Sequence, residues 1–301
     1  MRFGAFDFTL RQLQYLLAVA EAGSFRRAAE LCHVSQPSLS AQVAEAERAL
    51  GVKVFERGRG GVRITPAGAA VLERATLVVV AADDVVATAR HGEDPLQGAL
   101  RLGVIPTIAP YLLPTLDPAL RAAFPRLDLR WTEERTATLV EAIETGELDG
   151  AVVALEADLG QLESAVLGRD AFFFAAAHTH RLAAAPGALT LAALEQTDVL
   201  LLADGHCLGE QALSLCAAHG ARDLDFRATS LGTLVQMVAA GAAATLLPAM
   251  SLEVENRRGQ LAIRPFAEPP HRTIALAWRR GSALEPALRE IAAVGVAAVA
   301  A

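Results

Sequence analysis

Apolar residues recur at helical spacing through the first fifty residues of the chain. In residues 10–22, leucines and alanines return every three or four positions, which predicts an amphipathic helix. A second helix is expected over 25–32 and a third over 36–50, and Ser24 and Ser35 are suited to cap them. Only a tight turn separates the second helix from the third, so the two should pack against each other at an angle.

The third helix has one apolar and one polar face. Its inner stripe consists of Leu39, Val43, Ala46 and Leu50, while its outer face carries short polar side chains that can reach base edges. Two helices joined by a tight turn, the second displaying Gln and Ser, form the helix-turn-helix pattern, although the same residues could be a merely solvated face. The residues expected to contact DNA here are Ser35, Gln36, Pro37, Ser38, Ser40 and Gln42.

Two short strands are expected after this helix, over 52–55 and 62–65. They flank the sequence R-G-R-G-G, a basic and flexible hairpin tip suited to phosphates or to the minor groove. Arg57, Arg59 and Arg63 are therefore expected to contact DNA. Together, residues 1–66 predict a winged helix-turn-helix domain that binds double-stranded DNA.

Residues 66–90 predict one long helix, rich in Ala, Val and Leu and without internal breakers. A single helix this apolar has no core of its own, and pairing with a second copy of the chain would bury it. Residues 92–98 contain Gly and Pro and read as a hinge. We therefore expect residues 67–97 to link the domains and to make the protein a dimer.

The remainder of the chain alternates strands and helices, which predicts an α/β fold with largely parallel sheets. The expected elements are strands 100–105, 127–131, 150–154, 199–202, 226–229 and 272–278, and helices 111–123, 136–145, 208–217, one from 231 and one at the C-terminus. This order predicts a two-lobed sensor domain over 98–301, like a periplasmic binding protein. Lobe I would comprise about 98–170 and 271–301, and lobe II about 171–270.

Composition and charge narrow the class of protein. Hydrophobic residues make up 53% of the chain and charged residues 20%, which is typical of a globular protein. The net charge is −7, but residues 1–66 carry nine basic against six acidic residues, which favours a nucleic-acid contact at that end. No signal peptide or membrane span is evident, because the longest apolar stretch is interrupted by Asp83 and Asp84. We therefore expect a cytoplasmic protein.

Three cysteines, Cys32, Cys207 and Cys216, are too few for a disulfide framework, and no His cluster at metal-site spacing accompanies them. Cys32 reads as a core residue of the second helix. Cys207 could be a small core residue too, but it follows Gly205-His206 and opens a predicted helix. A helix N-terminus and a neighbouring imidazole both favour the thiolate, the form that attacks peroxide.

The N-terminal segment resembles the DNA-binding head of LysR-type regulators. The matching sequences are A-A-E-L-C-H-V-S-Q-P-S-L-S-A-Q, then L-G-V-K-V-F-E-R and I-T-P-A-G, within residues 24–68. One departure is Ala44-Glu45, which replaces a basic pair on the third helix.

The sensor half resembles the OxyR-type branch of that family, which responds to hydrogen peroxide. The matching sequences are G-V-I-P-T-I-A-P-Y-L-L-P (103–114), D-G-H-C-L (204–208), F-R-A-T-S-L (226–231) and R-T-I-A-L (272–276). The resemblance implies that peroxide oxidises Cys207 and that Cys216 is its disulfide partner. It also implies a peroxide pocket formed by Thr107, Thr136, His206 and Arg272, and a tetramer made of two dimers. Gly209-Glu210 replaces the Arg-Asp that relatives often carry, which removes a nearby cation.

The implied disulfide constrains the mechanism. Nine residues of helix span about 13.5 Å, whereas a disulfide needs Cα atoms no more than about 7 Å apart. The two sulfur atoms therefore cannot join while the helix is intact, and oxidation must unwind it.

Simpler interpretations exist for the pocket residues when the resemblance is set aside. Thr107 and Thr136 could cap helices, Arg272 could be an exposed charge at a strand start, and His206 could serve packing.

The sequence leaves three alternatives to a peroxide-sensing regulator. A LysR-type regulator could bind a small organic effector in its cleft, with incidental cysteines. A peroxide-reducing enzyme could use the same thiol, but its helix-turn-helix would be unexplained. A solute-binding protein would need an export signal. Our prediction is the regulator, not an enzyme, with no cofactor or metal and with RNA polymerase as a further candidate partner.

Overall fold

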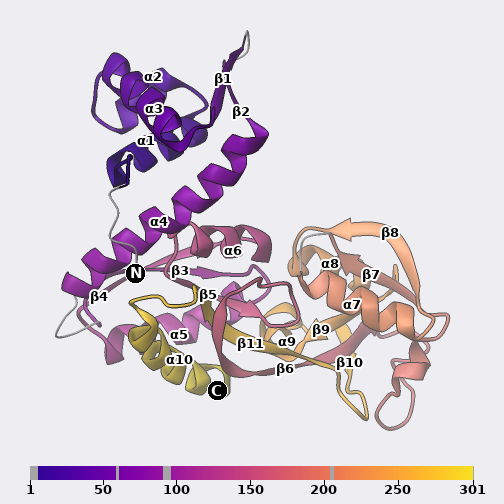
Figure 1. Ribbon diagram of the computed structural model, residues 1–301. Coiled ribbons are helices and arrows are strands. Elements are labelled where there is room, and N and C mark those ends of the chain that lie inside the picture. The colour runs from indigo at the N-terminus through magenta and orange to yellow at the C-terminus, as the bar shows by residue number, and fades with distance from the viewer. Residues whose placement is uncertain (1–5, 59–60, 91–95, 204–206, 301) are drawn as a thin grey trace. The chain divides into compact units, whose positions relative to one another are not determined.

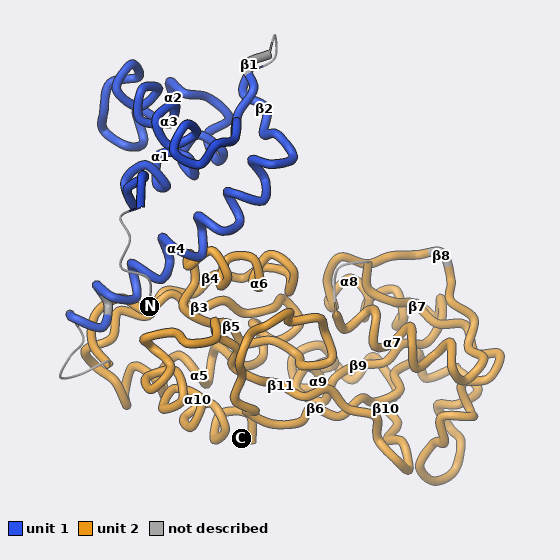
Figure 2. Tube along the Cα trace, viewed as in Figure 1, with its two compact units in different colours: residues 1–90 blue, residues 91–301 orange. Residues whose placement is uncertain are grey.

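The computed structural model describes residues 6–58, 61–90, 96–203 and 207–300. Its contacts divide the chain into two compact units, residues 1–90 and residues 91–301, shown in two colours in Figure 2. The long linker helix thus groups with the N-terminal unit. The separate linker segment predicted over 67–97 stays a prediction.

The N-terminal unit begins with the three expected helices, α1 (Leu10–Ala22), α2 (Phe25–Leu31) and α3 (Gln36–Leu50). Ser35 caps α3, because its side chain accepts a hydrogen bond from the Ser38 N–H. Ser24 stands at the N-cap of α2 but makes no capping hydrogen bond, so this part of the prediction is wrong. The turn between α2 and α3 is tight because His33 adopts a positive φ of 54°.

The hairpin of β1 (Phe55–Gly58) and β2 (Gly61–Ile64) follows, as antiparallel strands. The first strand starts three residues later than predicted, for a physical reason. The Val54 and Phe55 N–H groups donate to Oε1 of Glu47, at 2.9 and 3.1 Å, and not to a neighbouring strand. Burial raises the pKa of Glu47, but these bonds and the one from Lys53 outweigh it and hold the pKa below its usual value. Glu47 therefore fixes α3 to the base of the hairpin.

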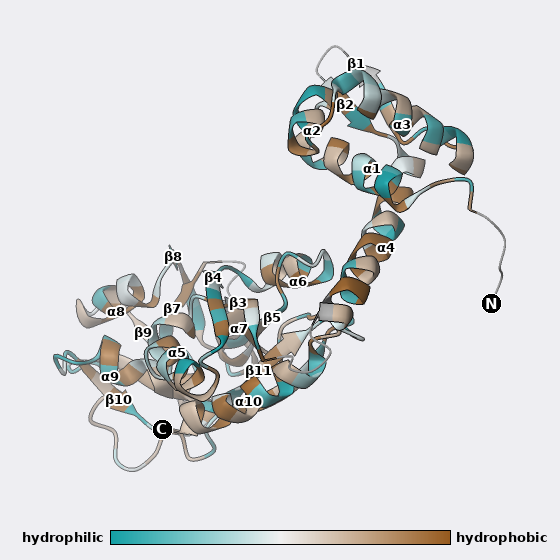
Figure 3. Cartoon of the chain, turned by 90° about the vertical axis from the view of Figure 1, so that its left-hand side faces the viewer, coloured by the Kyte–Doolittle hydropathy of each residue, from teal (hydrophilic) through white to brown (hydrophobic). Residues whose placement is uncertain are grey.

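Helix α4 (Pro66–Arg90) has the predicted bounds. Gly68 is required near its start, because a Cβ there would collide with the backbone of Val54. Leu72 and Ala75 join the core of the N-terminal unit, together with residues of α1 and α3. Further along, α4 leaves large apolar side chains exposed. Hydrophobic positions of this helix are brown in Figure 3. The exposed residues are Leu77, Val78, Val85 and Val86.

The second unit contains the expected mixture of strands and helices (Figure 1). Its strands are β3 (Gly98–Val104), β4 (Leu127–Glu133), β5 (Gly150–Ala154), β6 (Glu163–Ala177), β7 (Asp198–Leu202), β8 (Arg222–Ala228), β9 (Ala244–Pro248), β10 (Leu261–Arg264) and β11 (His271–Trp278). Its α-helices are α5 (Ala109–Ala123), α6 (Thr136–Glu144), α7 (Cys207–Ala218), α8 (Leu231–Ala239), α9 (Leu252–Glu255) and α10 (Glu285–Ala300), with short 3-10 turns at Leu191–Leu194 (η1) and Ala249–Ser251 (η2).

Strand β6 is the element that joins the two lobes. The strands lie in the order β4-β3-β5-β11-β6-β9-β7-β8, and β10 also pairs with β6. The first half of β6 pairs with β11, which belongs to lobe I, and its second half pairs with β9 and β10 of lobe II. In lobe I, β3 pairs in parallel with β4 and β5, while α5 and α10 pack against each other. The two-lobed α/β prediction is confirmed, but the expectation of largely parallel sheets is wrong, because β6 and β11 pair antiparallel with their neighbours.

The sequence pattern missed the strands β6, β9 and β10. Residues 163–170 mix polar, small and apolar side chains, so no alternation marks them as a strand. Strand β9 is buried at every position, as expected for a strand covered on both faces, and so lacks a period of two.

Lobe II buries its sheet on both faces. Leu200 and Leu202 of β7 share a core with α8, whereas Val199 and Leu201 share a core with α7. This alternation follows from the period of two in a strand. Among the described residues, no helix is long and apolar enough to cross a membrane.

Candidate functional site

Helix α7 carries both cysteines of the predicted redox pair. Cys207 is its first residue and Cys216 lies in its last turn, and both thiols are free. Each residue turns an α-helix by about 100°, so a separation of nine places the two side chains about 180° apart. Their neighbours agree with this, because Cys207 packs into the core of lobe I and Cys216 into a core of lobe II.

Cys207 is 6% exposed and lies among apolar side chains of lobe I. Burial raises the pKa of its thiol, while the Arg272 charge and the Thr136 hydroxyl lower it, and the net direction is upward. The sequence predicted a thiol with a lowered pKa, and this is wrong for the described conformation. Burial among apolar groups destabilises the thiolate by more than Arg272 and Thr136 stabilise it.

Cys216 is 1% exposed and sits between α7 and the sheet of lobe II. Burial and, to a smaller extent, the Asp223 charge raise the pKa of this thiol to about 11. Cys216 is thus a poor nucleophile while α7 is folded.

Helix α7 approaches the end of β7 closely at its first turn. A Cβ on Gly209 would lie 2.8 Å from the carbonyl oxygen of Leu202, so only glycine allows this approach. Glycine in a helix interior costs about 1 kcal/mol relative to alanine. The first turn of α7 is therefore closely packed yet intrinsically weak.

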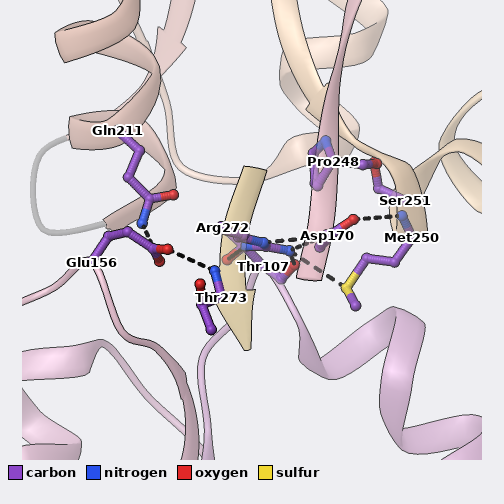
Figure 4. A network of polar contacts seen from close by, with 9 residues as sticks. All are labelled: Thr107, Glu156, Asp170, Gln211, Pro248, Met250, Ser251, Arg272 and Thr273. Atoms are coloured by element: carbon purple, nitrogen blue, oxygen red, sulfur yellow. Dashed lines mark hydrogen bonds and ion pairs between the residues drawn. The ribbon is translucent and has the colours of Figure 1, made fainter. Parts of the chain in front are cut away.

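Arg272 lies at the point where β11 pairs with β6, directly opposite Asp170 (Figure 4). Its guanidinium is 0% exposed, donates from Nε to Asp170 at 3.0 Å, and donates to both the hydroxyl and the carbonyl oxygen of Thr107, each at 2.9 Å. A further contact reaches the thioether of Met250 at 3.4 Å. The interpretation of Arg272 as an exposed charge is therefore wrong.

Neither threonine of the predicted pocket is a helix cap. Helix α5 begins at Ala109 with Ile108 at its N-cap, so Thr107 lies before the cap. Helix α6 begins at Thr136 itself, with Arg135 at its N-cap. The buried Thr136 hydroxyl has no hydrogen-bond partner among the described residues, although it lies close enough to Cys207 to lower the pKa of that thiol. A buried hydroxyl without a partner is unusual and suggests a site for a small polar ligand.

The structure thus brings together four of the predicted residues, namely Thr107, Thr136, Cys207 and Arg272. His206 belongs to the predicted pocket but lies outside the described residues. Arg59 and the side chain of Arg57 also lie outside the part of the chain that the structure describes.

A second space adjoins Cys207, a pocket of about 510 Å³. Glu156, Gln211 and His271 contribute polar groups to its lining. Glu156 accepts from the Thr273 N–H at 2.7 Å and from Nε2 of Gln211 at 3.3 Å, so its carboxylate connects β11 with α7 (Figure 4). The pocket is much larger than a peroxide molecule requires.

On the N-terminal unit, the residues predicted to read DNA lie on the surface of α3. Gln36, Pro37 and Ser38 are exposed, whereas Leu39 and Val43 on the opposite face are buried. Gln36 donates from Nε2 to the Ser40 hydroxyl at 3.2 Å, which orders two of the predicted contact residues. On β2, Arg63 is exposed. Cys32, predicted as a core residue of the second helix, is the C-cap residue of α2 and is only half-buried against the core of this unit.

Sequence reasoning missed Asp170, Met250 and Glu156. Asp170 stands next to Arg169, and only the strand register shows which of the two charged residues points inward. Met250 and Glu156 lie outside the regular strands and helices around them, where no periodicity assigns a direction. A signal was nevertheless present for Asp170, since an acid directly before the apolar run A-F-F-F is a candidate for burial.

Family comparisons match both units. Residues 10–69 match the bacterial regulatory helix-turn-helix protein, lysR family, and residues 93–298 match the LysR substrate binding domain. A hydrogen peroxide-inducible genes activator of Pectobacterium carotovorum subsp. carotovorum is 39% identical over 285 residues, which is 94% of each chain.

Solved structures extend the comparison to the fold. A full-length cysteine-to-aspartate variant of OxyR from Pseudomonas aeruginosa matches with a TM-score of 0.77 and 33% identity, covering 96% of this chain and 94% of that one. A cysteine-to-serine variant of OxyR from Corynebacterium glutamicum, with hydrogen peroxide bound, matches with a TM-score of 0.66 and 34% identity, covering 97% and 94%. The chain therefore belongs to the LysR family of bacterial transcription regulators, and within it to the OxyR-type branch.

The orphaned hydroxyl of Thr136 gives a first test of the site. Thr136→Val keeps the shape of the side chain and removes only the weak interaction of this hydroxyl with the Cys207 thiol, so thermal stability should change little. The rate at which peroxide oxidises Cys207 should fall about tenfold, the equivalent of one hydrogen bond of about 1.4 kcal/mol in the transition state. Stopped-flow kinetics with purified protein measures this rate.

Thr138→Val is the matched control, because Thr138 is exposed on the same helix. It should oxidise at the wild-type rate. If the wild type, Thr136→Val and Thr138→Val are oxidised at equal rates, Thr136 takes no part in the peroxide reaction.

Proposed function

We propose that the protein is a DNA-binding transcription regulator that senses hydrogen peroxide through Cys207 and Cys216 and controls oxidative-stress genes. One observation carries the proposal: two free, buried thiols lie on opposite faces of one helix, and one of them lies near Thr136 and near Arg272, which in turn donates to Thr107. Such an arrangement lets oxidation of a single sulfur atom rearrange a whole element of the sensor.

Two redox steps follow from the chemistry. The Cys207 thiolate attacks one oxygen of hydrogen peroxide, the O–O bond breaks, and the departing hydroxide takes up the thiol proton and leaves as water. The Cys216 thiolate then attacks the sulfur of the Cys207 sulfenic acid. An S–S bond forms, the S–O bond breaks, and a second water leaves with the Cys216 proton. Two thiols are oxidised and one peroxide is reduced.

Both thiols have a raised pKa in the folded state, which shapes the order of events. Only a small thiolate fraction of Cys207 is present at neutral pH, so the pocket must favour the transition state by hydrogen bonds. Cys216 must leave its apolar surroundings before it can ionise. The second step therefore follows unwinding of α7, which both exposes Cys216 and shortens its distance to Cys207.

The peroxide pocket consists of Thr107, Thr136, Arg272 and His206 in this proposal. The Thr107 hydroxyl accepts from Arg272 and so can donate its own proton to a peroxide oxygen. The Thr136 hydroxyl can donate or accept. Arg272 supplies positive charge where the leaving hydroxide develops negative charge.

The N-terminal unit would place α3 in the major groove of double-stranded DNA, with Ser35, Gln36, Pro37, Ser38, Ser40 and Gln42 near the bases. Arg57, Arg59 and Arg63 of the hairpin would bind phosphates or the minor groove. The exposed apolar residues of α4 support a dimer through this helix. We further propose a tetramer of two dimers, RNA polymerase as a partner, and a cytoplasmic location, where promoter DNA is found. No enzymatic turnover is part of this proposal.

The pocket of about 510 Å³ beside Cys207 favours one second candidate, a regulator that binds a small organic effector. An effector-binding function would leave the placement of Cys207 and Cys216 on opposite faces of α7 unexplained.

The cysteine variants separate these candidates. Peroxide at low micromolar concentration should join Cys207 to Cys216 within one chain of the wild-type protein, as read by peptide mass mapping. Cys207→Ser should not respond, since no sulfenic acid can form. Cys216→Ser should still be attacked and should stop at the sulfenic or sulfinic acid.

Cys32→Ser is the matched control and should form the disulfide like the wild type. If Cys207 stays reduced in the wild type, or if Cys207→Ser protein still changes its DNA binding with peroxide, the effector-binding candidate takes the place of this proposal.

DNA binding should divide between the hairpin and α3. Arg63→Ala should weaken binding to all DNA and reduce the slope of log affinity against log salt by about 1, because one phosphate contact is lost. Gln36→Ala should mainly reduce the preference for operator DNA, by about 1–3 kcal/mol. Fluorescence anisotropy with a sequence selected by the wild-type protein and with random DNA measures both effects.

Arg130→Ala, which removes an exposed charge from the sensor domain, serves as the control and should leave both affinities unchanged. Equal losses on both DNAs for Gln36→Ala would contradict this division.

A further inference from the structure

Asp170 is the one carboxylate that contacts the pocket arginine in the described part of the chain. Its Oδ2 lies 3.0 Å from Nε of Arg272 and 2.9 Å from a terminal guanidinium nitrogen, and its Oδ1 accepts from the Met250 N–H at 3.1 Å. The side chains of Arg272 and Asp170 are 0% and 3% exposed. Water and salt therefore do little to screen this pair.

The pair fixes the place of the guanidinium. Asp170 lies across from Arg272 in the β6–β11 register, so the strand pairing holds the carboxylate on one side. Thr107 accepts two hydrogen bonds on another side, and the Met250 sulfur contacts a terminal nitrogen. Asp170 also binds the backbone of η2 through Met250, so it ties the arginine to lobe II as well as to lobe I (Figure 4).

The pair also limits the field that the arginine exerts. A lone positive charge in a buried site acts over a long distance, whereas a close ion pair behaves as a dipole whose effect falls off faster. Cys207 lies within reach of the Arg272 charge. The carboxylate on Arg272 therefore reduces the stabilisation that a thiolate at Cys207 receives.

We propose that Asp170 is a positioning residue for the peroxide reaction, which holds the Arg272 guanidinium against Thr107 and offsets its charge, and so restrains the reactivity of Cys207. The proposal rests on the assignment of Cys207 as the peroxide-reactive thiol. It gives the sensor a threshold, because Cys207 ionises less readily than it would beside an uncompensated arginine. Restraint of this kind keeps the regulator reduced at resting peroxide levels.

The other titratable groups near this site, among the described residues, are Glu156, Glu210, His271 and Tyr111. Glu156, Glu210 and His271 are exposed, so solvent screens their charges. Burial and the hydrogen bond to Glu255 raise the pKa of Tyr111 far above its usual range, so this side chain stays neutral. Asp170 is thus the carboxylate whose charge the solvent screens least.

The test is the pH profile of the thiol in full-length protein. The background is Cys32→Ser with Cys216→Ser, which leaves Cys207 as the only thiol. The rate of alkylation by iodoacetamide, a neutral reagent, is followed across the pH range in which thiols titrate, and peroxide oxidation is measured in parallel. Asp170→Asn should shift the midpoint of the profile down by roughly one unit and raise the rate at neutral pH about tenfold.

Asp170→Glu keeps the charge and should restore a midpoint near that of the parent protein. A purely structural role predicts a different outcome for Asp170→Asn, namely an unchanged or higher midpoint with lower rates at every pH. An unchanged midpoint or a raised midpoint for Asp170→Asn, in protein that circular dichroism shows to be folded, overturns the proposal.

Asp170→Asn leaves a buried arginine without its partner and could prevent folding. The neutral pair Asp170→Asn with Arg272→Gln then carries the test. Because the field of the intact pair is small in our account, removing both charges should raise the midpoint by less than about one unit. A larger rise shows that the charge of Arg272 reaches Cys207 without being offset, and contradicts the proposal.

Alkylation reports on Cys207 whether or not peroxide is the signal. A Cys207 that titrates as expected but ignores peroxide contradicts the proposed function and leaves the role of Asp170 in thiol ionisation intact. An unshifted titration with normal peroxide oxidation contradicts the role of Asp170 alone.

Discussion

The rotation of an α-helix is the constraint on which the sensor depends. Nine residues of α7 place Cys207 and Cys216 on opposite faces and about 13.5 Å apart along the axis. One thiol is thereby buried against lobe I and the other against lobe II. A disulfide between them is incompatible with the helix, so the reduced and oxidised states must differ in fold and not only in covalent structure.

The composition of α7 suits a helix that is folded in the reduced protein and unwinds on oxidation. A helix of twelve residues is marginal in water by itself, so its stability comes from packing against the sheet of lobe II. Gly209 permits that packing and at the same time weakens the first turn. At the other end, the His219 ring contacts the carbonyl oxygen of Leu215 at 2.8 Å and satisfies one of the terminal acceptors.

The site around Cys207 combines burial with compensated charge. Burial raises the pKa of the thiol, while Arg272 and the two threonines offer hydrogen bonds to a small polar oxidant. A buried ion pair such as Arg272 with Asp170 adds little net stability compared with apolar residues of the same size. Its presence at the junction of β6 and β11 is better explained by its effect on the reaction beside it.

Much of this architecture could be predicted from the sequence, and the failures have physical causes. Apolar spacing, together with caps or glycines at the ends, predicts helices α1, α3 and α4. Their bounds agree with the prediction to within a residue. Residue types also singled out Cys207, whereas Cys216 as its partner and Arg272 as a pocket residue came from the family resemblance. Sequence could not show that Arg272 is buried or that Asp170 faces it. Nor could it show that burial raises the pKa of Cys207 by more than the neighbouring groups lower it. Each of these depends on strand register and on contacts between residues far apart in the chain.

Amide hydrogen exchange of α7 tests the central claim most directly. Full-length protein is compared before and after peroxide treatment, with Cys216→Ser protein as the control that can be oxidised but cannot form the disulfide. Residues 207–219 should lose protection in the oxidised wild-type protein and keep much more of it in the control, while residues 36–50 of the DNA-binding helix exchange as before. A disulfide between Cys207 and Cys216 in a protein whose α7 amides remain fully protected would contradict the account.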